Sequence, residues 1–297
     1  MRRRLWTRAI PYLLIAPAFT AILLVVAYPF ANALWMSLHE AQLLRPHRTA
    51  FVGLGNFHQA LADPVFQESI GNTAVWVLGT VAAQLLLGLG FALVLNESFA
   101  GRGLVRAAVL LPWVTPSVVC AVIFVWMYDG SFGVLNHILR GLGILSQPFP
   151  WLAESLTALP CTMSALVWHG FPFFTLMLLA ALQVIPAELY EAARVDGAGA
   201  WRGFRHITLP LIAPTLLILI LLRTIWVSNH VDIPYVMTGG GPGYSSTTIA
   251  LYTMSVARVK LDFGYASALS LLLATVLFAC ASAYFTYLRC RERGVRP

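Results

Sequence analysis

The sequence predicts an all-α, polytopic membrane protein with six transmembrane helices. Hydrophobic residues make up 59% of the chain and charged residues only 10%. A soluble surface usually needs about 25% charged residues, so we expect lipid to be the surrounding solvent. Apolar stretches of about 20 residues, enough to cross a bilayer as a helix, recur along the chain. We expect them to form a single transmembrane domain over residues 1–297.

The apolar stretches of spanning length mark the expected helices in chain order. They cover residues 10–36, 70–96, 106–128, 157–184, 210–234 and 264–288. The first stretch follows three arginines, as the core of a signal peptide does, but it is too long for such a core. We therefore expect it to be a retained first span.

Prolines within the spans predict that these helices pack in a bundle or line a cavity. In lipid, a backbone group freed by a proline has to find a partner in protein or water. The interrupted spans are the third, fourth and fifth, which contain Pro112, Pro116, Pro172 and Pro214. In the second span, Gly79 and Ala83 lie one turn apart, as do Gly88 and Ala92, a spacing of small residues that lets helices approach closely.

The basic residues predict the orientation of the chain. The net charge of +7 arises at the termini and in short loops, which is typical of membrane topology and not of a nucleic-acid-binding face. An even number of spans puts both termini on one side, and Arg and Lys favour the cytoplasm. The side that includes the termini carries Arg2, Arg3, Arg4, Arg8, Arg102, Arg106, Arg194, Arg202, Arg205, Arg289, Arg291, Arg293 and Arg296. The opposite side carries Arg45, Arg48, Arg140, Arg258 and Lys260. We expect cytoplasmic N and C termini.

The chemistry-bearing residues indicate no catalytic centre. Three cysteines lie in apolar segments and one in the basic tail, so neither a disulfide framework nor a zinc site is supported. His169 and His230 stand apart from any metal-ligand or nucleophile set, and we expect no metal site. The chain contains no Gly-x-x-x-x-Gly-Lys-Ser/Thr phosphate loop, so we expect it to bind no cofactor and hydrolyse no ATP itself.

The loop at 185–209 predicts two short helices on the cytoplasmic side. Pro186 suits a first helical residue, Glu188 favours the positive end of the helix dipole, and Gly197 suits a left-handed stop. Four residues of the first helix share one face by their three-and-four spacing, with Glu191 at its flank: Leu189, Ala192, Ala193 and Asp196. Such a helix is shaped to sit in a groove of another protein.

This loop resembles the EAA loop of binding-protein-dependent ABC importer permeases, whose pattern is EAA, then Asp-Gly-Ala, then Ile-x-Leu-Pro. The matching positions are Glu191, Ala192, Ala193, Asp196, Gly197, Ala198, Ile207, Leu209 and Pro210. The resemblance implies a type I importer-like permease whose coupling helix, with Glu188 beside the motif, docks on a separate ATPase. It further implies a second permease of the same class, two ATPase subunits that bind ATP and Mg, an external solute-binding protein, and a bacterial inner-membrane location.

Other segments are similar to the sugar-importer branch, the maltose and glycerol-phosphate permeases. They are Phe51-Val-Gly-Leu-Gly-Asn56-Phe57, Asp63-Pro-Val-Phe66, Asn72-Thr73, Tyr235-Val-Met-Thr238-Gly-Gly-Gly-Pro242 and Gly264-Tyr265-Ala266-Ser267-Ala268. The resemblance implies import of a carbohydrate by alternating access. The chain departs from the pattern at His230-Val-Asp232-Ile-Pro234, where relatives usually have Phe-Asp and an aliphatic residue in place of the proline.

Polar and aromatic residues at membrane depth are the candidates for a substrate pathway, because burying polar groups in lipid is costly. The candidates are Trp168, His169, Arg223, Trp226, Asn229, His230 and Asp232. By helical spacing, Trp226, Asn229 and His230 share a face suited to a sugar ring. Ordinary bundle packing is the alternative for this set. Arg223 has two further interpretations, a counter-charge to an anionic substrate such as a sugar phosphate, or a structural partner of another helix.

A secondary transporter driven by an ion gradient is the main rival function. Such a protein would show inverted repeats with ionisable residues near the midplane, and the sequence shows no clear repeat. An exposed EAA loop would also have no purpose in it. We therefore expect an importer permease.

Overall fold

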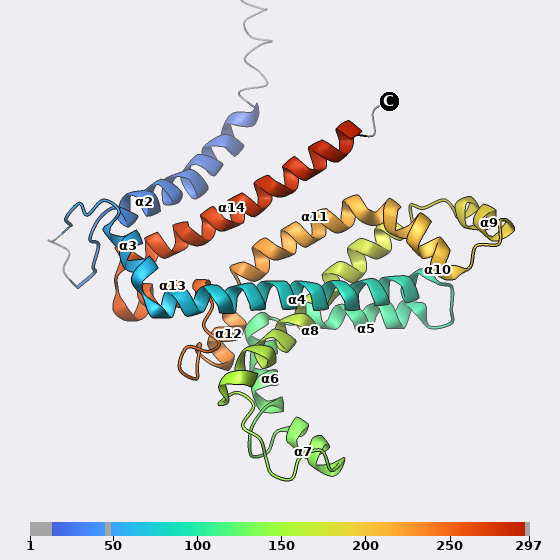
Figure 1. Cartoon of the computed structure of the whole chain (residues 1–297), viewed down its shortest axis with the longest axis horizontal. Coiled ribbons are helices and arrows are strands. Elements are labelled where there is room, and N and C mark those ends of the chain that lie inside the picture. Colours follow the sequence, from blue (N-terminus) through green and yellow to red (C-terminus); the bar gives the residue numbers. More distant parts are fainter. Residues whose placement is uncertain (1–13, 45–48, 295–297) are drawn as a thin grey trace, which may run out of the picture. The chain divides into compact units, whose positions relative to one another are not determined.

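The computed structural model describes residues 14–44 and 49–294, with side chains up to residue 286. Within these ranges the regular structure is helical, apart from two isolated β-bridges (Figure 1). The prediction of an all-α protein is confirmed. The described residues form two compact units, unit 1 within 1–63 and 253–276, and unit 2 within 64–252 and 277–297.

Unit 1 contains the helices nearest the N-terminus and the segment that leads into the last helix. Its elements are the π-helical turn η1 (Leu23–Ala27), α2 (Tyr28–Ser37), α3 (Gly55–Ala62), the end of α13 (Ile249–Ser255), η3 (Val256–Lys260) and the first part of α14 (Phe263–Gly294). Asn56 is buried and its Nδ2 donates to the carbonyl oxygens of Ser37 at 2.8 Å and His39 at 3.0 Å. The Tyr265 hydroxyl donates to Asp63 Oδ2 at 2.8 Å. Asn56 thus ties its motif to the residues at the end of α2, and Tyr265 ties the start of α14 to the motif that begins at Asp63.

Unit 2 contains the remaining helices. They are α4 (Pro64–Asn96), α5 (Arg102–Val114), α6 (Ser117–Met127), α7 (Val134–Gly141), α8 (Ser155–Leu182), α9 (Ala187–Val195), α10 (Ala200–Gly203), the π-helical turn η2 (Phe204–Thr208), α11 (Leu209–Ser228) and α12 (Asp232–Met237). Helices α9 and α10 lie at one end of the long helices α4, α8 and α11, and α12 lies towards the other end (Figure 1).

Five helical segments of the described chain are long and apolar enough to cross a membrane. They are Leu14–Ser37, Pro64–Asn96, Ser155–Leu182, Ala200–Met237 and Phe263–Thr286. The α5–α6 pair passes the same test but bends by 95°, so the total is six if this pair is one span. The six predicted spans overlap these segments, although the third is broken by the bend and residues 10–13 of the first lie outside the described residues. That each of them crosses the membrane stays a prediction. The cytoplasmic location of the termini stays a prediction.

The prolines of the third, fourth and fifth spans act differently. At Thr115 the backbone becomes extended, with φ −69° and ψ 127°, and α6 starts after Pro116. Because a proline disfavours the helical conformation in the residue before it, the break falls at this dipeptide. Helices α8 and α11, by contrast, continue through Pro172 and Pro214.

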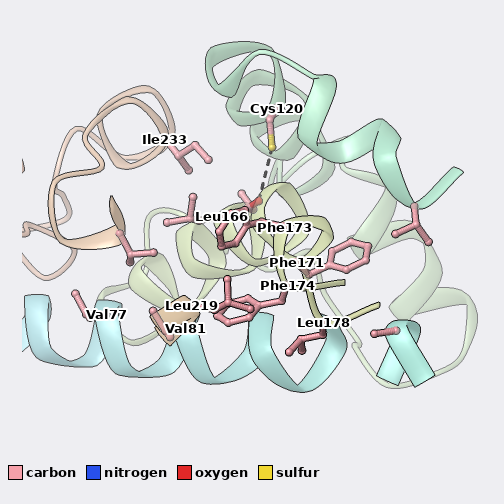
Figure 2. Close-up of a cluster of buried hydrophobic side chains, with 14 of the residues drawn as sticks. Val77, Val81, Cys120, Leu166, Phe171, Phe173, Phe174, Leu178, Leu219 and Ile233 are labelled. Carbon is pink, nitrogen blue, oxygen red and sulfur yellow. Dashed lines mark hydrogen bonds between the residues drawn. The ribbon is translucent and has the colours of Figure 1, made fainter. Parts of the chain in front are cut away.

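Helix α8 is the centre of unit 2. Of its apolar window, 61% is buried inside the protein, against 33% for α4. Its buried side chains pack with those of α4, α6, α11 and α12 in one cluster (Figure 2). Gly88 of α4 faces Phe171, Phe174 and Thr175 of α8 so closely that a Cβ atom there would overlap the Cβ of Phe174. The small-residue spacing predicted for the second span thus serves the approach of α4 to α8.

We expect Gly88→Val to destabilise the bundle, because the added side chain has no room against α8. Overpacking of this kind costs about 1–3 kcal/mol. The thermal unfolding midpoint of the detergent-purified protein should fall relative to the wild type. Gly90→Val is the matched control, since nothing lies within 4 Å of a Cβ at that position of the same helix. Equal midpoints for the two variants would contradict the close packing.

Candidate functional site

Helix α9 is the exposed part of the loop that joins α8 to α11. None of its residues is buried, and Glu188 lies in its first turn, where a carboxylate interacts favourably with the helix dipole. Pro186 occupies the position before the first helical residue, so the helix begins one residue later than predicted. Glu191 and Ala192 are exposed. The helix therefore displays a carboxylate and a small side chain on an open surface.

The end of α9 is a Schellman motif. Gly197 has φ +75°, the left-handed conformation that glycine adopts without steric cost. Its N–H donates to the Arg194 carbonyl at 3.0 Å, and the Ala198 N–H donates to the Ala193 carbonyl at 2.8 Å. These two bonds satisfy carbonyl groups that the helix end would leave open. The predicted left-handed stop at Gly197 is confirmed, and Asp196 lies exposed just before it.

The inner side of α9 is tied to the segment that starts α11. The Tyr190 hydroxyl and Thr208 Oγ1 form a hydrogen bond of 2.8 Å. Ala193 is half-buried and lines, with Tyr190, a cavity of about 860 Å³ that also touches the ends of α4 and α8. Ala193, which helical spacing places on the same face as Ala192, is less exposed than Ala192 within this chain. One hydrogen bond thus links α9 to the residue that precedes α11.

His169 satisfies the carbonyl group that the break between α5 and α6 leaves open. Its Nε2 atom donates to the carbonyl oxygen of Thr115, 3.1 Å away. An unpaired carbonyl in a membrane span costs several kcal/mol. This candidate residue thus has a structural reason for its position in α8.

A second break separates α11 from α12. Helix α11 ends at Ser228, and Asn229 Nδ2 donates back to the Ile225 carbonyl at 2.8 Å. The predicted single helical face of Trp226, Asn229 and His230 is therefore wrong, because the helix stops before two of the three. Across the break, Ser117 Oγ of α6 donates to Asp232 Oδ2 at 2.8 Å.

Arg223 lies in the interior of the bundle with 6% of its surface exposed. Its Nε atom donates to Gln84 Oε1 at 2.9 Å, and Gln84 Nε2 donates to the Leu166 carbonyl at 2.7 Å. Gly170 makes room for both side chains, since a Cβ there would overlap each of them. No carboxylate of the described residues pairs with Arg223, and its Nη2 atom has no hydrogen-bond partner among them. Gln84 is thus the structural partner of this arginine.

The structure brings most of the predicted pathway residues together but leaves two aside. The rings of His169 and His230 have centroids 6.5 Å apart. The guanidinium of Arg223 lies 5.9 Å from the Trp226 ring and 5.8 Å from the Phe173 ring. Asp232 is connected to the group by its hydrogen bond with Ser117, which lies two residues after the Thr115 that His169 contacts.

Trp168 and Asn229 lie outside this group. Trp168 packs against Phe124, 5.9 Å between ring centroids, and lines a separate hollow of about 510 Å³ with Tyr128 and Met163. The Asn229 side chain forms its hydrogen bond within the end of its own helix, α11. Three further residues at this site were not predicted from the sequence: Gln84, Phe173 and Ser117. Gln84 carried a signal, because it is an amide inside the apolar stretch 74–95.

Comparison with solved structures gives the class of the fold. A chain of a bacterial ABC transporter involved in the import of the acidic polysaccharide alginate superposes with a TM-score of 0.81 at 23% identity, over 99% of this chain and all of that one. A chain of the MetNI methionine ABC transporter superposes less closely, with a TM-score of 0.54 over 75% of this chain and 94% of that one, at 18% identity. The fold is that of an ABC transporter membrane subunit.

Sequence comparison gives the family. Residues 84–293 match the model of the binding-protein-dependent transport system inner membrane component. The trehalose/maltose transport system permease protein MalF of Thermococcus litoralis is 40% identical over 95% of this chain and 94% of its own. SmoG, the sulfoquinovosyl glycerol transport system permease protein of Agrobacterium fabrum, is 36% identical over 96% and 92%. The chain belongs to this family of inner membrane components, as the EAA resemblance predicted.

We expect Gly197→Val to loosen the end of α9. A β-branched residue in the left-handed conformation costs about 1–2 kcal/mol, so the Schellman bonds should open more often. Hydrogen exchange of the α9 amides should become faster. Gly199→Val is the control, because Gly199 has an ordinary φ of −74° and open space around its Cβ position. Unchanged exchange in Gly197→Val would contradict the role of this stop.

We expect Gln84→Leu to destabilise the bundle by orphaning the buried Arg223. Leaving a buried donor without its acceptor costs about 1–3 kcal/mol, and more for a charged group. The unfolding midpoint in detergent should fall, whereas Gln84→Glu, which keeps an acceptor, should lose less. Gln183→Leu, an exposed glutamine at the end of α8, is the control. An unchanged unfolding midpoint for Gln84→Leu would show that the hydrogen bond between Arg223 and Gln84 contributes nothing to stability.

Proposed function

We propose that this chain is the channel-forming permease subunit of an ATP-driven importer of a carbohydrate, a di- or oligosaccharide or a related compound. The family supports import that depends on a binding protein. The names of the relatives support a carbohydrate, since they include a trehalose/maltose permease, a sulfoquinovosyl glycerol permease and the trehalose permease SugA of Mycobacterium tuberculosis. We further propose that residues 1–297 work as one permease domain.

The single observation that carries the proposal is the exposed, capped helix α9. A helix without buried residues is normally marginal alone in water, yet this one has a rigid stop at Gly197 and a hydrogen bond from Tyr190 to the start of α11. Such a helix is suited to dock on another protein and to transmit force. The proposed docking residues are Glu188, Glu191, Ala192, Asp196 and Gly197, with Ala193 on the inner side.

The energy for transport comes from partner subunits in this proposal. Two ATPase subunits bind ATP and Mg, and their closure moves α9 and with it α11. A second permease of the same class completes the pore, and an external solute-binding protein delivers the sugar. ATP-driven closure favours one of two conformations because it binds that conformation better, as any conformational switch requires.

The proposed substrate pathway runs along the group of His169, Arg223, Trp226, His230 and Asp232. Trp226 is 47% exposed and rests against Phe173 with ring centroids 5.2 Å apart, so an aromatic face is open to a sugar ring. Hydrogen-bonding groups beside it fit the few polar contacts that orient a ligand in an apolar site. The group lies where α5–α6 and α11–α12 both break, so movement of these helices would reshape it.

We expect Glu191→Ala to uncouple transport from ATP hydrolysis. The complete importer, co-expressed with its neighbouring genes, is reconstituted in liposomes for measurement of sugar uptake and ATP hydrolysis. Loss of a charged contact at the docking surface should lower ATP-driven uptake about tenfold, the effect of roughly 1.4 kcal/mol, while the detergent unfolding midpoint stays unchanged. The control is Glu68→Ala, an exposed carboxylate near the opposite end of α4.

Two results would count against the proposed function. One is uptake by Glu191→Ala at the wild-type rate. The other is uptake that follows an ion gradient with no ATPase copurifying, which would favour the secondary transporter.

A further inference from the structure

The loop at 238–248, between α12 and α13, is held in one conformation by its own side chains. Thr247 Oγ1 donates to the Gly240 carbonyl at 2.8 Å, and Ser246 Oγ donates to the Gly241 carbonyl at 2.7 Å. Thr238 Oγ1 bonds to Ser246 Oγ at 2.8 Å. Ser246 and Thr247 are buried. The hydroxyls of Thr238, Ser246 and Thr247 are therefore paired within the loop, whereas the buried Ser245 hydroxyl has no hydrogen-bond partner among the described residues.

Helix α4 fixes the loop in place. Asn72 Nδ2 donates to two carbonyl oxygens of the loop, those of Tyr244 at 3.1 Å and Thr247 at 3.2 Å. Just after the loop, the Ile249 N–H donates to Thr73 Oγ1 at 2.9 Å. The loop is thus anchored to the first turns of a spanning helix.

Tyr244 stands at the tip of this loop in a strained conformation. Its φ is +71° and 51% of its surface is exposed. A left-handed backbone is unfavourable for a residue with a Cβ, and so exposed a ring recovers little of this cost through packing within the chain. Residues with a strained backbone that rigid surroundings hold in place are found most often at functional sites. A tyrosine held in this way is ready to contact something outside the chain.

The position of the loop restricts what that contact is. Helix α11, 20 residues long, rises about 30 Å from the α9 segment to the break before α12, so the loop lies at the other end of the bundle from α9 (Figure 1). With ATPases docked at α9, the loop faces the external side. Its sequence from Gly239 to Thr248 is composed of Gly, Pro, Ser, Thr and the single Tyr, which does not suit contact with lipid tails.

We propose that Tyr244 is an anchor for the external solute-binding protein, presented by the rigid 238–248 loop. This inference rests on the proposed function. Tyrosine is among the residues that dominate protein interfaces. A loop already ordered before binding loses less conformational freedom on association. The strained backbone of Tyr244 is offset by the hydrogen bonds from Asn72 and within the loop.

The test is the stimulation of ATP hydrolysis by the binding protein. The complete importer in lipid nanodiscs is titrated with the binding protein from the neighbouring genes, loaded with maltose or trehalose. Tyr244→Gly removes the ring and suits the left-handed backbone, so the loop itself should stay folded. The half-stimulating concentration should rise about tenfold, the effect of losing an interface anchor, with basal hydrolysis unchanged. Tyr244→Phe should stay close to the wild type.

Two further variants separate contact from folding. Asn72→Ala keeps the ring but frees the loop, and it should also raise the half-stimulating concentration. Tyr235→Ala, a tyrosine of α12 that is 53% exposed, should leave it unchanged.

The results distinguish this inference from the proposed function. If the binding protein stimulates the Tyr244→Gly complex with the same half-stimulating concentration as the wild type, the role of Tyr244 is overturned and the proposed function is not. Loss of the second permease from the purified Tyr244→Gly complex would also overturn it, because the ring would then serve contact between permeases. A wild-type complex that no binding protein stimulates would overturn both the inference and the proposed function.

Discussion

The close approach of α4 and α8 is the contact on which the rest of unit 2 depends. Between helices in lipid the hydrophobic effect supplies no net attraction, so dense packing and interhelical hydrogen bonds hold them together. Gly88 lets the two helices touch, and Gly170 opens the space for the Gln84 and Arg223 side chains. Gln84 then bonds to α8 on one side and to α11 on the other. A larger residue at Gly88 would push α4 away from α8, and one at Gly170 would collide with side chains of both α4 and α11.

The breaks in the spans are compatible with a membrane because the protein covers them. Irregular backbone at membrane depth is tolerated where protein groups satisfy it or where it lines a cavity. His169 bonds the carbonyl at the first break, and Asn229 bonds the end of α11 at the second. The Ser117–Asp232 bond links the two. The pieces on either side of each break therefore have a defined contact and need not move as one rod, which suits a pathway that opens alternately to two sides.

Both ends of α11 present surfaces that are rigid before any partner arrives. At one end, Gly197 and Tyr190 fix α9, although none of its residues is buried. At the other end, Asn72 and the side chains of the 238–248 loop fix Tyr244, although half of its surface is exposed. Exposed segments in most proteins are mobile because few contacts hold them. Local hydrogen bonds supply the order here, and this lowers the entropy lost on docking.

Hydropathy, proline positions and the EAA pattern were enough to predict the all-α class, the spans and the left-handed stop at Gly197, because each depends on residues close together in the chain. The same reasoning failed at the end of α11, where helical spacing was extended past Ser228 and grouped Asn229 and His230 with Trp226. It also put Trp168 with His169, although neighbours in sequence point to different sides of a helix. The candidate site was therefore only partly predictable.

Only the tertiary structure decided the contacts between residues far apart in the chain. The partner of Arg223 is 139 positions away, and the anchor of Tyr244 is 172 positions away. The amino-acid pattern shows that a buried arginine needs a partner, but which residue becomes that partner depends on where glycines let helices approach each other. Likewise, a proline indicates that a span is interrupted, whereas the 95° bend between α5 and α6 depends on the packing of α6 against its neighbours. Local conformation follows from the chain itself, and long-range pairing follows from the shape of the packed bundle.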